Sequence, residues 1–111
     1  MSWLVRDGDV LAAAELANGA RARRRGLLGR DSYTGALVLR PCRNVHTARM
    51  RFPIDVAFCD GEMRVIDVLA PMHRYRFGRP RWNARMVIEA EAGAFDRWQL
   101  RVGDQLEIKG E

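Results

Sequence analysis

The residues best suited to chemistry lie in one short stretch, His46 to Asp60, which reads HTARMRFPIDVAFCD. Its first ten residues, His46 to Asp55, contain an imidazole, a hydroxyl, two guanidiniums, a thioether and a carboxylate. Arginines bind anions through charge-assisted hydrogen bonds, and a histidine exchanges protons near neutral pH. The stretch therefore predicts a cleft that binds a small anionic molecule. The predicted ligand contacts are His46, Thr47, Arg49, Arg51 and Asp55.

Asp55 has two interpretations. It enters an apolar strand on the face opposite Ile54 and Val56, where an unpaired carboxylate would be costly to bury. In a functional role it is a general base or an anchor for the ligand. In a structural role it pairs with an arginine such as Arg51 or Arg24 and ties a helix to the sheet. The two roles are compatible, and the structural one is favoured.

An enzyme is the first alternative to a binding protein. His46 and Asp55 would then act as acid and base, in a hydrolase-like reaction on a small anionic or sugar-like substrate. The sequence lacks a Ser-His-Asp pattern, a phosphate-binding glycine loop and a dinucleotide fingerprint. Cys42 and His46 stand four residues apart without a second pair at metal-ligand spacing. We therefore expect no metal site and no cofactor, and the balance is against catalysis.

The charge is strongly basic and unevenly distributed. The formal net charge is +5, and Lys109 is the only lysine. Residues 19–51 contain nine arginines against one acid, and residues 72–85 contain five arginines and no acid. A further alternative is therefore nucleic-acid binding through Arg21–Arg30 and the 74–85 loop. It is not favoured, because no aromatic residue is interleaved within Arg21–Arg30 for base stacking.

Length and composition set the broad class. A chain of 111 residues is expected to form a single domain, 1–111. No apolar run of about 18 residues predicts a transmembrane helix, and the N-terminus lacks the features of a signal peptide. We therefore expect a cytoplasmic protein without a membrane partner, whose Cys42 and Cys59 are reduced. The oligomeric state is not indicated by the sequence.

Alternating apolar residues with Asp-Gly and Gly-Asp turns predict short strands. In the segment 63–69 this alternation places Met63, Val65, Asp67 and Leu69 on one face. A long loop is expected from Pro71 to Asn83. The pattern is typical of a mostly β, small β-barrel-like fold with one or two short helices, and α+β is the alternative. The expected strands are 3–6, 10–16, 36–39, 54–59, 63–69, 85–90 and 105–108, with short helices at 20–28 and 94–99.

Four segments together resemble the family called domain of unknown function 192. The central one is His46 to Asp60, and Arg21–Arg30 is similar to the family's Arg-x-x-Gly-Leu segment. Two later segments of the family match residues 87–89 with Gly93 and the pair 103–104. The resemblance covers roughly residues 12–108. The residues taken from it as structural motif positions are Arg24, Gly26, Arg30, Met50, Pro53, Gly103 and Asp104.

The resemblance implies a mostly β domain whose biochemical role is unassigned. Family members are often exported, whereas this sequence shows no export signal. They usually have bulky residues after the His-Thr pair, where this chain has Ala48 and Arg49. A pocket wall that depends on such bulk is therefore not expected here.

Overall fold

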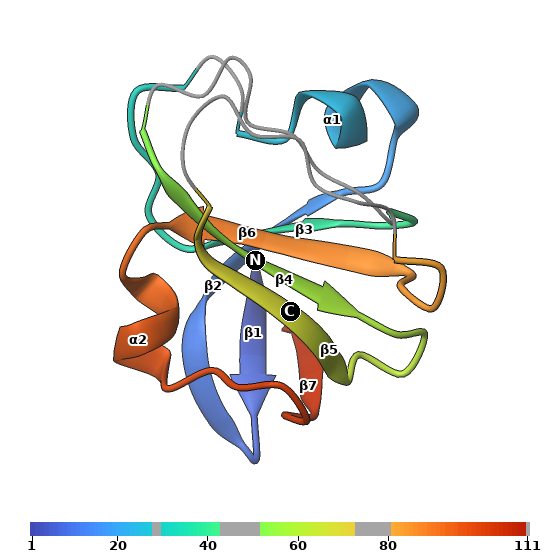
Figure 1. Ribbon diagram of the computed structural model, residues 1–111, viewed down its shortest axis with the longest axis vertical. Helices are drawn as coiled ribbons and strands as arrows, with labels where there is room; N and C mark the ends of the chain where they lie inside the picture. Colours follow the sequence, from blue (N-terminus) through green and yellow to red (C-terminus); the bar gives the residue numbers. More distant parts are fainter. Residues whose placement is uncertain (28–29, 43–51, 73–80, 111) are drawn as a thin grey trace.

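Seven strands and two short helices make up the computed structural model, which describes residues 1–27, 30–42, 52–72 and 81–110 (Figure 1). The prediction of a mostly β, barrel-like fold with one or two short helices is confirmed. The elements are β1 (Ser2–Arg6), β2 (Asp9–Ala17), α1 (Ala20–Arg25), β3 (Ala36–Leu39), β4 (Ile54–Cys59), β5 (Val65–Met72), β6 (Met86–Glu91), α2 (Ala94–Trp98) and β7 (Leu106–Gly110).

The strands form one sheet in the order β5-β4-β6-β3-β2-β1-β7. All neighbours are antiparallel except β2 and β3, which run parallel with α1 in the connection between them. The sheet curves so that its edges approach one another, and in the described part of the chain one bridge joins them, between Arg64 and Gln105. The Leu106 N–H donates to the Met63 carbonyl beside that bridge, at 3.0 Å. The edges thus meet at one point, and the sheet is barrel-like without being a closed barrel.

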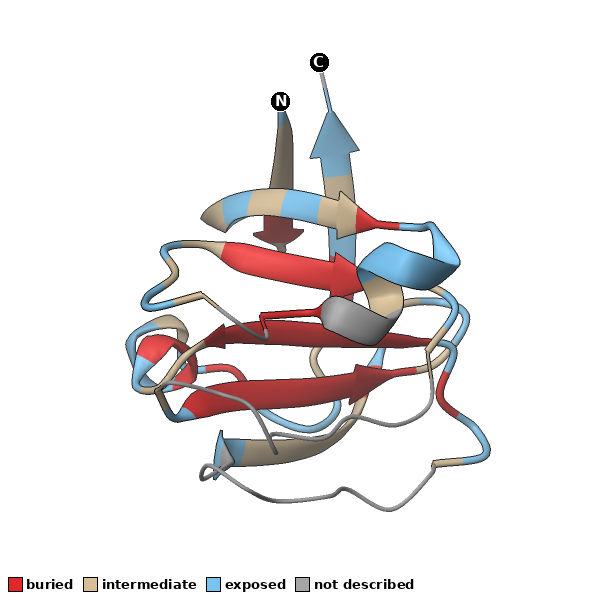
Figure 2. Cartoon of the chain, turned by 90° about the horizontal axis from the view of Figure 1, so that it is seen from above, coloured by how far each residue is buried: buried red, intermediate tan, exposed pale blue. Residues whose placement is uncertain are grey.

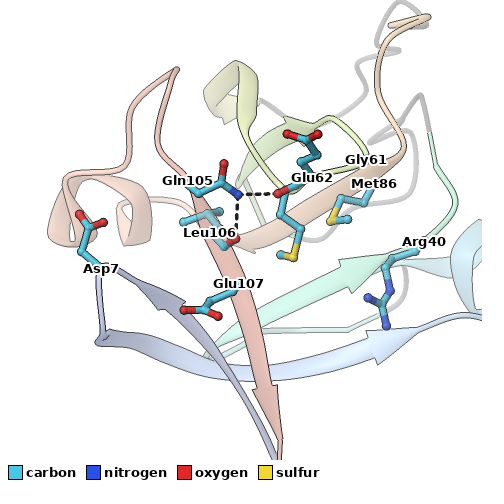
Figure 3. Close-up of a pocket in the computed structure, with 9 residues that line it drawn as sticks. Asp7, Arg40, Gly61, Glu62, Met86, Gln105, Leu106 and Glu107 are labelled. Carbon is cyan, nitrogen blue, oxygen red and sulfur yellow. Dashed lines mark hydrogen bonds between the residues drawn. The ribbon is translucent and has the colours of Figure 1, made fainter.

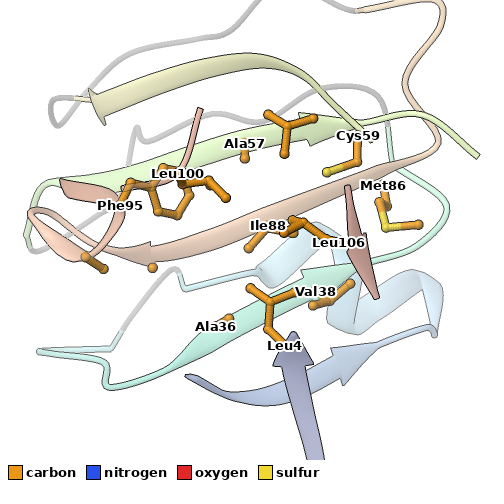
Figure 4. Close-up of a cluster of buried hydrophobic side chains, with 13 residues drawn as sticks. Leu4, Ala36, Val38, Ala57, Cys59, Met86, Ile88, Phe95, Leu100 and Leu106 are labelled. Atoms are coloured by element: carbon orange, nitrogen blue, oxygen red, sulfur yellow. The ribbon is translucent and has the colours of Figure 1, made fainter. Parts of the chain in front are cut away.

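The middle strands β3, β4 and β6 are buried on both faces (Figure 2). Their side chains alternate between two apolar clusters. Ala57 and Ile88 belong to one, which we call the Phe95 cluster because α2 contributes Phe95 to it (Figure 4). Val56, Phe58 and Val87 belong to the other, the Leu27 cluster, on the opposite face. A carboxylate on any of these strands therefore faces one of the two apolar clusters, and its position in the alternation decides which one.

The Asp-Gly turns form as predicted, but two expectations for β5 are wrong. The strand does not end at Leu69; it continues through Pro71 to Met72, paired with Ile54. Proline is tolerated there because β5 is an edge strand, whose outer N–H groups need no partner.

The predicted common face of Met63, Val65, Asp67 and Leu69 is also wrong. Phe58 pairs with Asp67 and Cys59 with Val65, so one residue of β5 bulges out between them. The bulge reverses the alternation, because Val65 packs in the Phe95 cluster whereas Leu69 packs against the Leu27 cluster.

Helix α1 is shorter than the predicted 20–28 because Gly26 takes a positive φ of 49° and ends it. Within the described ranges, no helix has the length and apolar character needed to cross a membrane.

Candidate functional site

Asp55 lies in β4 with only 1% of its surface exposed. Its Oδ2 accepts hydrogen bonds from the N–H groups of Gly93 and Phe95, both at 3.0 Å. These N–H groups begin α2, so the carboxylate fastens that helix to the sheet. Oδ1 is buried and has no hydrogen-bond partner among the described residues. Burial raises the pKa of Asp55, and the two N–H bonds oppose that effect.

Asp55 therefore has a structural role, as the sequence favoured, and its partners are backbone N–H groups. The predicted pairing with Arg51 or Arg24 falls on side chains outside the described set. Whether Asp55 also touches a ligand stays a prediction. Its carboxylate lies on the face of Ala57 and Cys59, beneath α2.

Glu89 is the second buried acid, and it faces the Leu27 cluster from β6. It is 3% exposed, and its Oε1 accepts a hydrogen bond from the Leu27 N–H at 3.1 Å. A Cβ on Gly26 would lie 2.7 Å from the same oxygen, and Gly26 has a positive φ of 49°, so a larger residue would strain the backbone and displace the Glu89 carboxylate. Burial raises the pKa of Glu89 to about 7, against the opposing effects of the Leu27 N–H and the Arg30 charge. Glu89 can therefore gain or lose a proton near neutral pH.

Arg30 belongs to a half-exposed group next to this site. Its guanidinium forms an ion pair with Glu15 at 3.2 Å and lies 5.1 Å from the centre of the Tyr33 ring. The Tyr33 hydroxyl donates to the same carboxylate at 3.2 Å. Burial, with the Glu15 charge second, raises the pKa of Tyr33 to about 12. Glu15 thus neutralises the charge of Arg30, and Arg30 is not available to bind an anion.

The other predicted motif positions are spread over the fold. Pro53 is exposed at the start of β4, and its carbonyl accepts from the Ala92 N–H at 3.3 Å. Gly103 has a positive φ of 98° in the turn before β7. Asp104 forms an ion pair with Arg6 at 2.9 Å. These residues fix turns and edges of the sheet.

Most of the predicted ligand contacts fall outside the described residues, namely His46, Thr47, Arg49 and Arg51, together with Met50. The residues on either side of that segment are described. Cys42 and Phe52 both pack against the Leu27 cluster. Arg81, which follows the second undescribed stretch, places its guanidinium 4.1 Å from the centre of the Phe58 ring, in the same cluster.

Several described arginines at this end of the sheet bond to neutral oxygens. Arg23 donates to the carbonyls of Asn18 and Arg40. Arg85 donates to the carbonyls of Trp82 and Ala84, both at 3.0 Å. A neutral acceptor leaves the positive charge of a guanidinium uncompensated. Arg23 and Arg85 therefore contribute net positive potential, unlike Arg30 with its carboxylate partner.

A separate open hollow of about 580 Å³ lies near the approach of the sheet edges (Figure 3). Asp7, Glu62 and Glu107 line it, and Arg40 is the only basic side chain among the described lining residues. In Figure 3 the Gln105 side-chain amide donates to the Glu62 carbonyl. Three acids against one arginine disfavour an anion there. The hollow is therefore distinct from the site that the motif predicts.

Cysteine and metal chemistry receive no structural support among the residues described. Cys42 and Cys59 are not joined in a disulfide, and burial raises the pKa of Cys59 to about 12. A thiol of that pKa stays protonated and is a poor nucleophile. No group of three His, Cys, Asp or Glu side chains in the described ranges could hold a metal ion.

The sequence interpretation gave no site role to Glu89 or Trp82. Glu89 was visible as a lone acid in an apolar strand, the same signal that drew attention to Asp55. Trp82 lay within an expected loop, where exposure could not be read from the residue type. Its side chain is 74% exposed.

Comparison with known proteins gives a family and a fold. The model of domain of unknown function 192 (DUF192), described as "Uncharacterized ACR", matches residues 3–108. A curated relative, UPF0127 protein PF1050 of Pyrococcus furiosus, is 34% identical over 64 residues. That match spans 58% of this chain and 54% of the relative, about half its length.

Two solved structures share the fold. A protein of unknown function from Novosphingobium aromaticivorans has a TM-score of 0.80 at 21% identity, covering 96% of this chain and 82% of that one. A protein of Sinorhizobium meliloti, described as a candidate transcription regulator, has a TM-score of 0.78 at 19% identity, covering 96% and 90%. At these identities the likeness concerns the fold alone.

Proposed function

This chain belongs to the DUF192 family, and we propose that it binds a small anionic ligand on the Leu27-cluster side of the sheet. The ligand would lie beside the segment His46 to Asp60. His46, Thr47, Arg49 and Arg51 are the proposed contacts. The Asp55 carboxylate fastens α2 on the opposite face of the sheet.

One observation carries the proposal. The described residues that border the segments 43–51 and 73–80, namely Cys42, Phe52 and Arg81, all contact the Leu27 cluster. By sequence, those two segments contain six arginines and no acid. The described residues next to these two arginine-bearing segments thus lie on the same side of the sheet, and positive charge favours binding of an anion.

The described arginines add to that potential. Arg23 and Arg85 have neutral hydrogen-bond acceptors, so their charges are not cancelled by a described carboxylate. The Cys42 N–H donates to the Arg85 carbonyl at 3.0 Å, so Arg85 adjoins the start of the 43–51 segment. Glu89 opposes an anion when ionised, but a carboxyl with a pKa near 7 is partly neutral at physiological pH.

Calorimetric titration with inorganic phosphate and pyrophosphate, at low and moderate salt, tests the proposal. We expect saturable binding that weakens as salt rises, because exposed charges are screened. Arg85→Gln and the double variant Arg49→Gln/Arg51→Gln should each weaken binding several-fold or more, as charge-assisted hydrogen bonds are lost.

Arg64→Gln is the matched control for Arg85→Gln. Arg64 is also exposed, and its guanidinium also donates to a neutral carbonyl, that of Gly103 at 3.2 Å. It lies at the meeting point of the sheet edges, away from the Leu27 cluster. Absence of saturable binding, or an equal loss in Arg64→Gln, would refute an anion site at the proposed location.

A further inference from the structure

The exposed tryptophan stands on a well-defined turn. The Ala84 N–H donates to the Arg81 carbonyl at 2.9 Å, which places Trp82 and Asn83 at the tip. Ala84 is fully buried, whereas the Trp82 side chain is 74% exposed. Every other aromatic side chain in the described ranges is buried or intermediate. A single exposed apolar residue is common in proteins, so further evidence must come from its surroundings.

The turn is anchored on both sides. Before it, Arg81 lies over the Phe58 ring and forms an ion pair with Asp67 at 2.8 Å. After it, the Arg85 N–H donates to the Cys59 carbonyl at 2.8 Å. The indole is therefore presented from a backbone fixed to β4, β5 and β6. A preorganised aromatic surface loses less entropy on binding than one carried by a loose chain.

The same turn carries a cationic group. Arg85 Nη1 donates to the Trp82 and Ala84 carbonyls, so the guanidinium adjoins the backbone of the turn. A guanidinium has five N–H donors, and these two contacts leave others available. Arg85 is exposed and forms no ion pair with a described carboxylate. The turn thus combines an open aromatic face with a positive charge.

We infer that the ligand of the proposed anion site carries a planar aromatic ring beside its anionic group, as a mononucleotide does, and that the ring stacks on Trp82 while Arg85 contacts the anion. This inference rests on the proposed function and specifies its ligand. Base stacking on an exposed aromatic ring is tolerant of base identity. A neutral sugar would also stack on indole but would not use the charge of Arg85. A nucleotide matches both features.

The test compares adenosine monophosphate, adenosine and inorganic phosphate by calorimetry, with wild-type protein and Trp82→Ala. We expect adenosine monophosphate to bind more tightly than phosphate. Trp82→Ala should weaken binding of adenosine monophosphate on the order of tenfold, and leave phosphate binding unchanged. Val102→Ala is the matched control, because Val102 is a similarly exposed apolar residue at 60%; it should bind both ligands as the wild type does.

The outcomes separate this inference from the proposed function. If phosphate and adenosine monophosphate bind equally and Trp82→Ala changes neither, the aromatic ligand is refuted while the anion site stands. If neither ligand binds, both are refuted. A short single-stranded oligonucleotide is the third probe. If it binds at least a hundredfold more tightly than adenosine monophosphate, and Trp82→Ala weakens its binding too, the ligand is a nucleic-acid strand and the mononucleotide is refuted.

Discussion

Two buried carboxylates on adjacent strands show how differently one chemical group is used in this fold. Asp55 pairs in register with Ala90, and Glu89 pairs with Val56, so the two acids are near neighbours on opposite faces of the sheet. Asp55 meets two N–H groups of α2, whereas Glu89 meets one N–H and a glycine packed against its oxygen. The first fastens a helix. The second titrates near neutral pH on the side proposed to bind a ligand.

The largest expected effect is that of Gly26→Ala. The new Cβ would lie 2.7 Å from Glu89 Oε1, and the residue would keep a positive φ. Steric overlap and backbone strain together should lower the free energy of unfolding by about 4 kcal/mol, measured by urea denaturation. Gly61→Ala is the control, because its Cβ would meet only Arg85 Cγ at an ordinary 3.7 Å. Equal stability of the two variants would contradict the close packing of Glu89.

Asp55→Ala should have the next largest effect. It leaves the N–H groups of Gly93 and Phe95 without their acceptor, which should cost about 3 kcal/mol of unfolding free energy. Asp55→Asn keeps an acceptor oxygen and should cost less than half as much. Hydrogen exchange of the two amides would locate the loss in α2. Unchanged protection of these amides in Asp55→Ala would show that the carboxylate does not hold the helix.

Glu89 should make stability fall as pH rises. Its folded pKa is about 7, above the ordinary value of 4.5, so the folded state binds the proton more tightly than the unfolded state. The stabilisation is complete below about pH 4.5 and is lost as pH rises through 7, amounting to about 2 kcal/mol between pH 5 and 8. Glu89→Gln should remove this part of the pH dependence. A wild-type profile that rises over the same interval would contradict the assignment.

Arg30→Gln should have the smallest effect. Its ion pair with Glu15 joins side chains that are 35% and 52% exposed, so solvent screening limits its contribution. We expect a loss under about 1 kcal/mol, decreasing with added salt. Thermal denaturation at two salt concentrations measures it. A salt-independent loss of several kcal/mol would indicate that Arg30 acts mainly on buried Glu89 instead.

Much of the fold follows from local patterns. The alternation in 54–59 and the turns at Asp7-Gly8 and Asp60-Gly61 predicted β4 and two hairpins, and the structure has them. The bulge in β5 was not predictable, because its register depends on pairing with β4. The extension of β5 through Pro71 likewise depends on its place at the sheet edge, which only the strand order reveals.

The candidate site was harder to predict than the fold. Asp55 and Glu89 both appear in the sequence as single acids in apolar strands, but which face each occupies follows from the sheet. The partner of Asp55 is a backbone 38 to 40 residues further along the chain, and that of Glu89 is 62 residues earlier. A backbone N–H partner cannot be recognised from residue types, because every residue except proline has one. The sequence therefore suggested a side-chain partner for Asp55, an arginine.

The most direct test of the proposed anion site is an amide chemical-shift map during titration with inorganic phosphate. Because the site is proposed on the Leu27-cluster side, the largest described shifts should fall on Cys42, Ala84 and Arg85. Gly93 and Phe95, held by Asp55 on the other face, should stay unchanged. Shifts concentrated at α2, or no saturable shifts at all, would contradict a ligand site on the Leu27-cluster side.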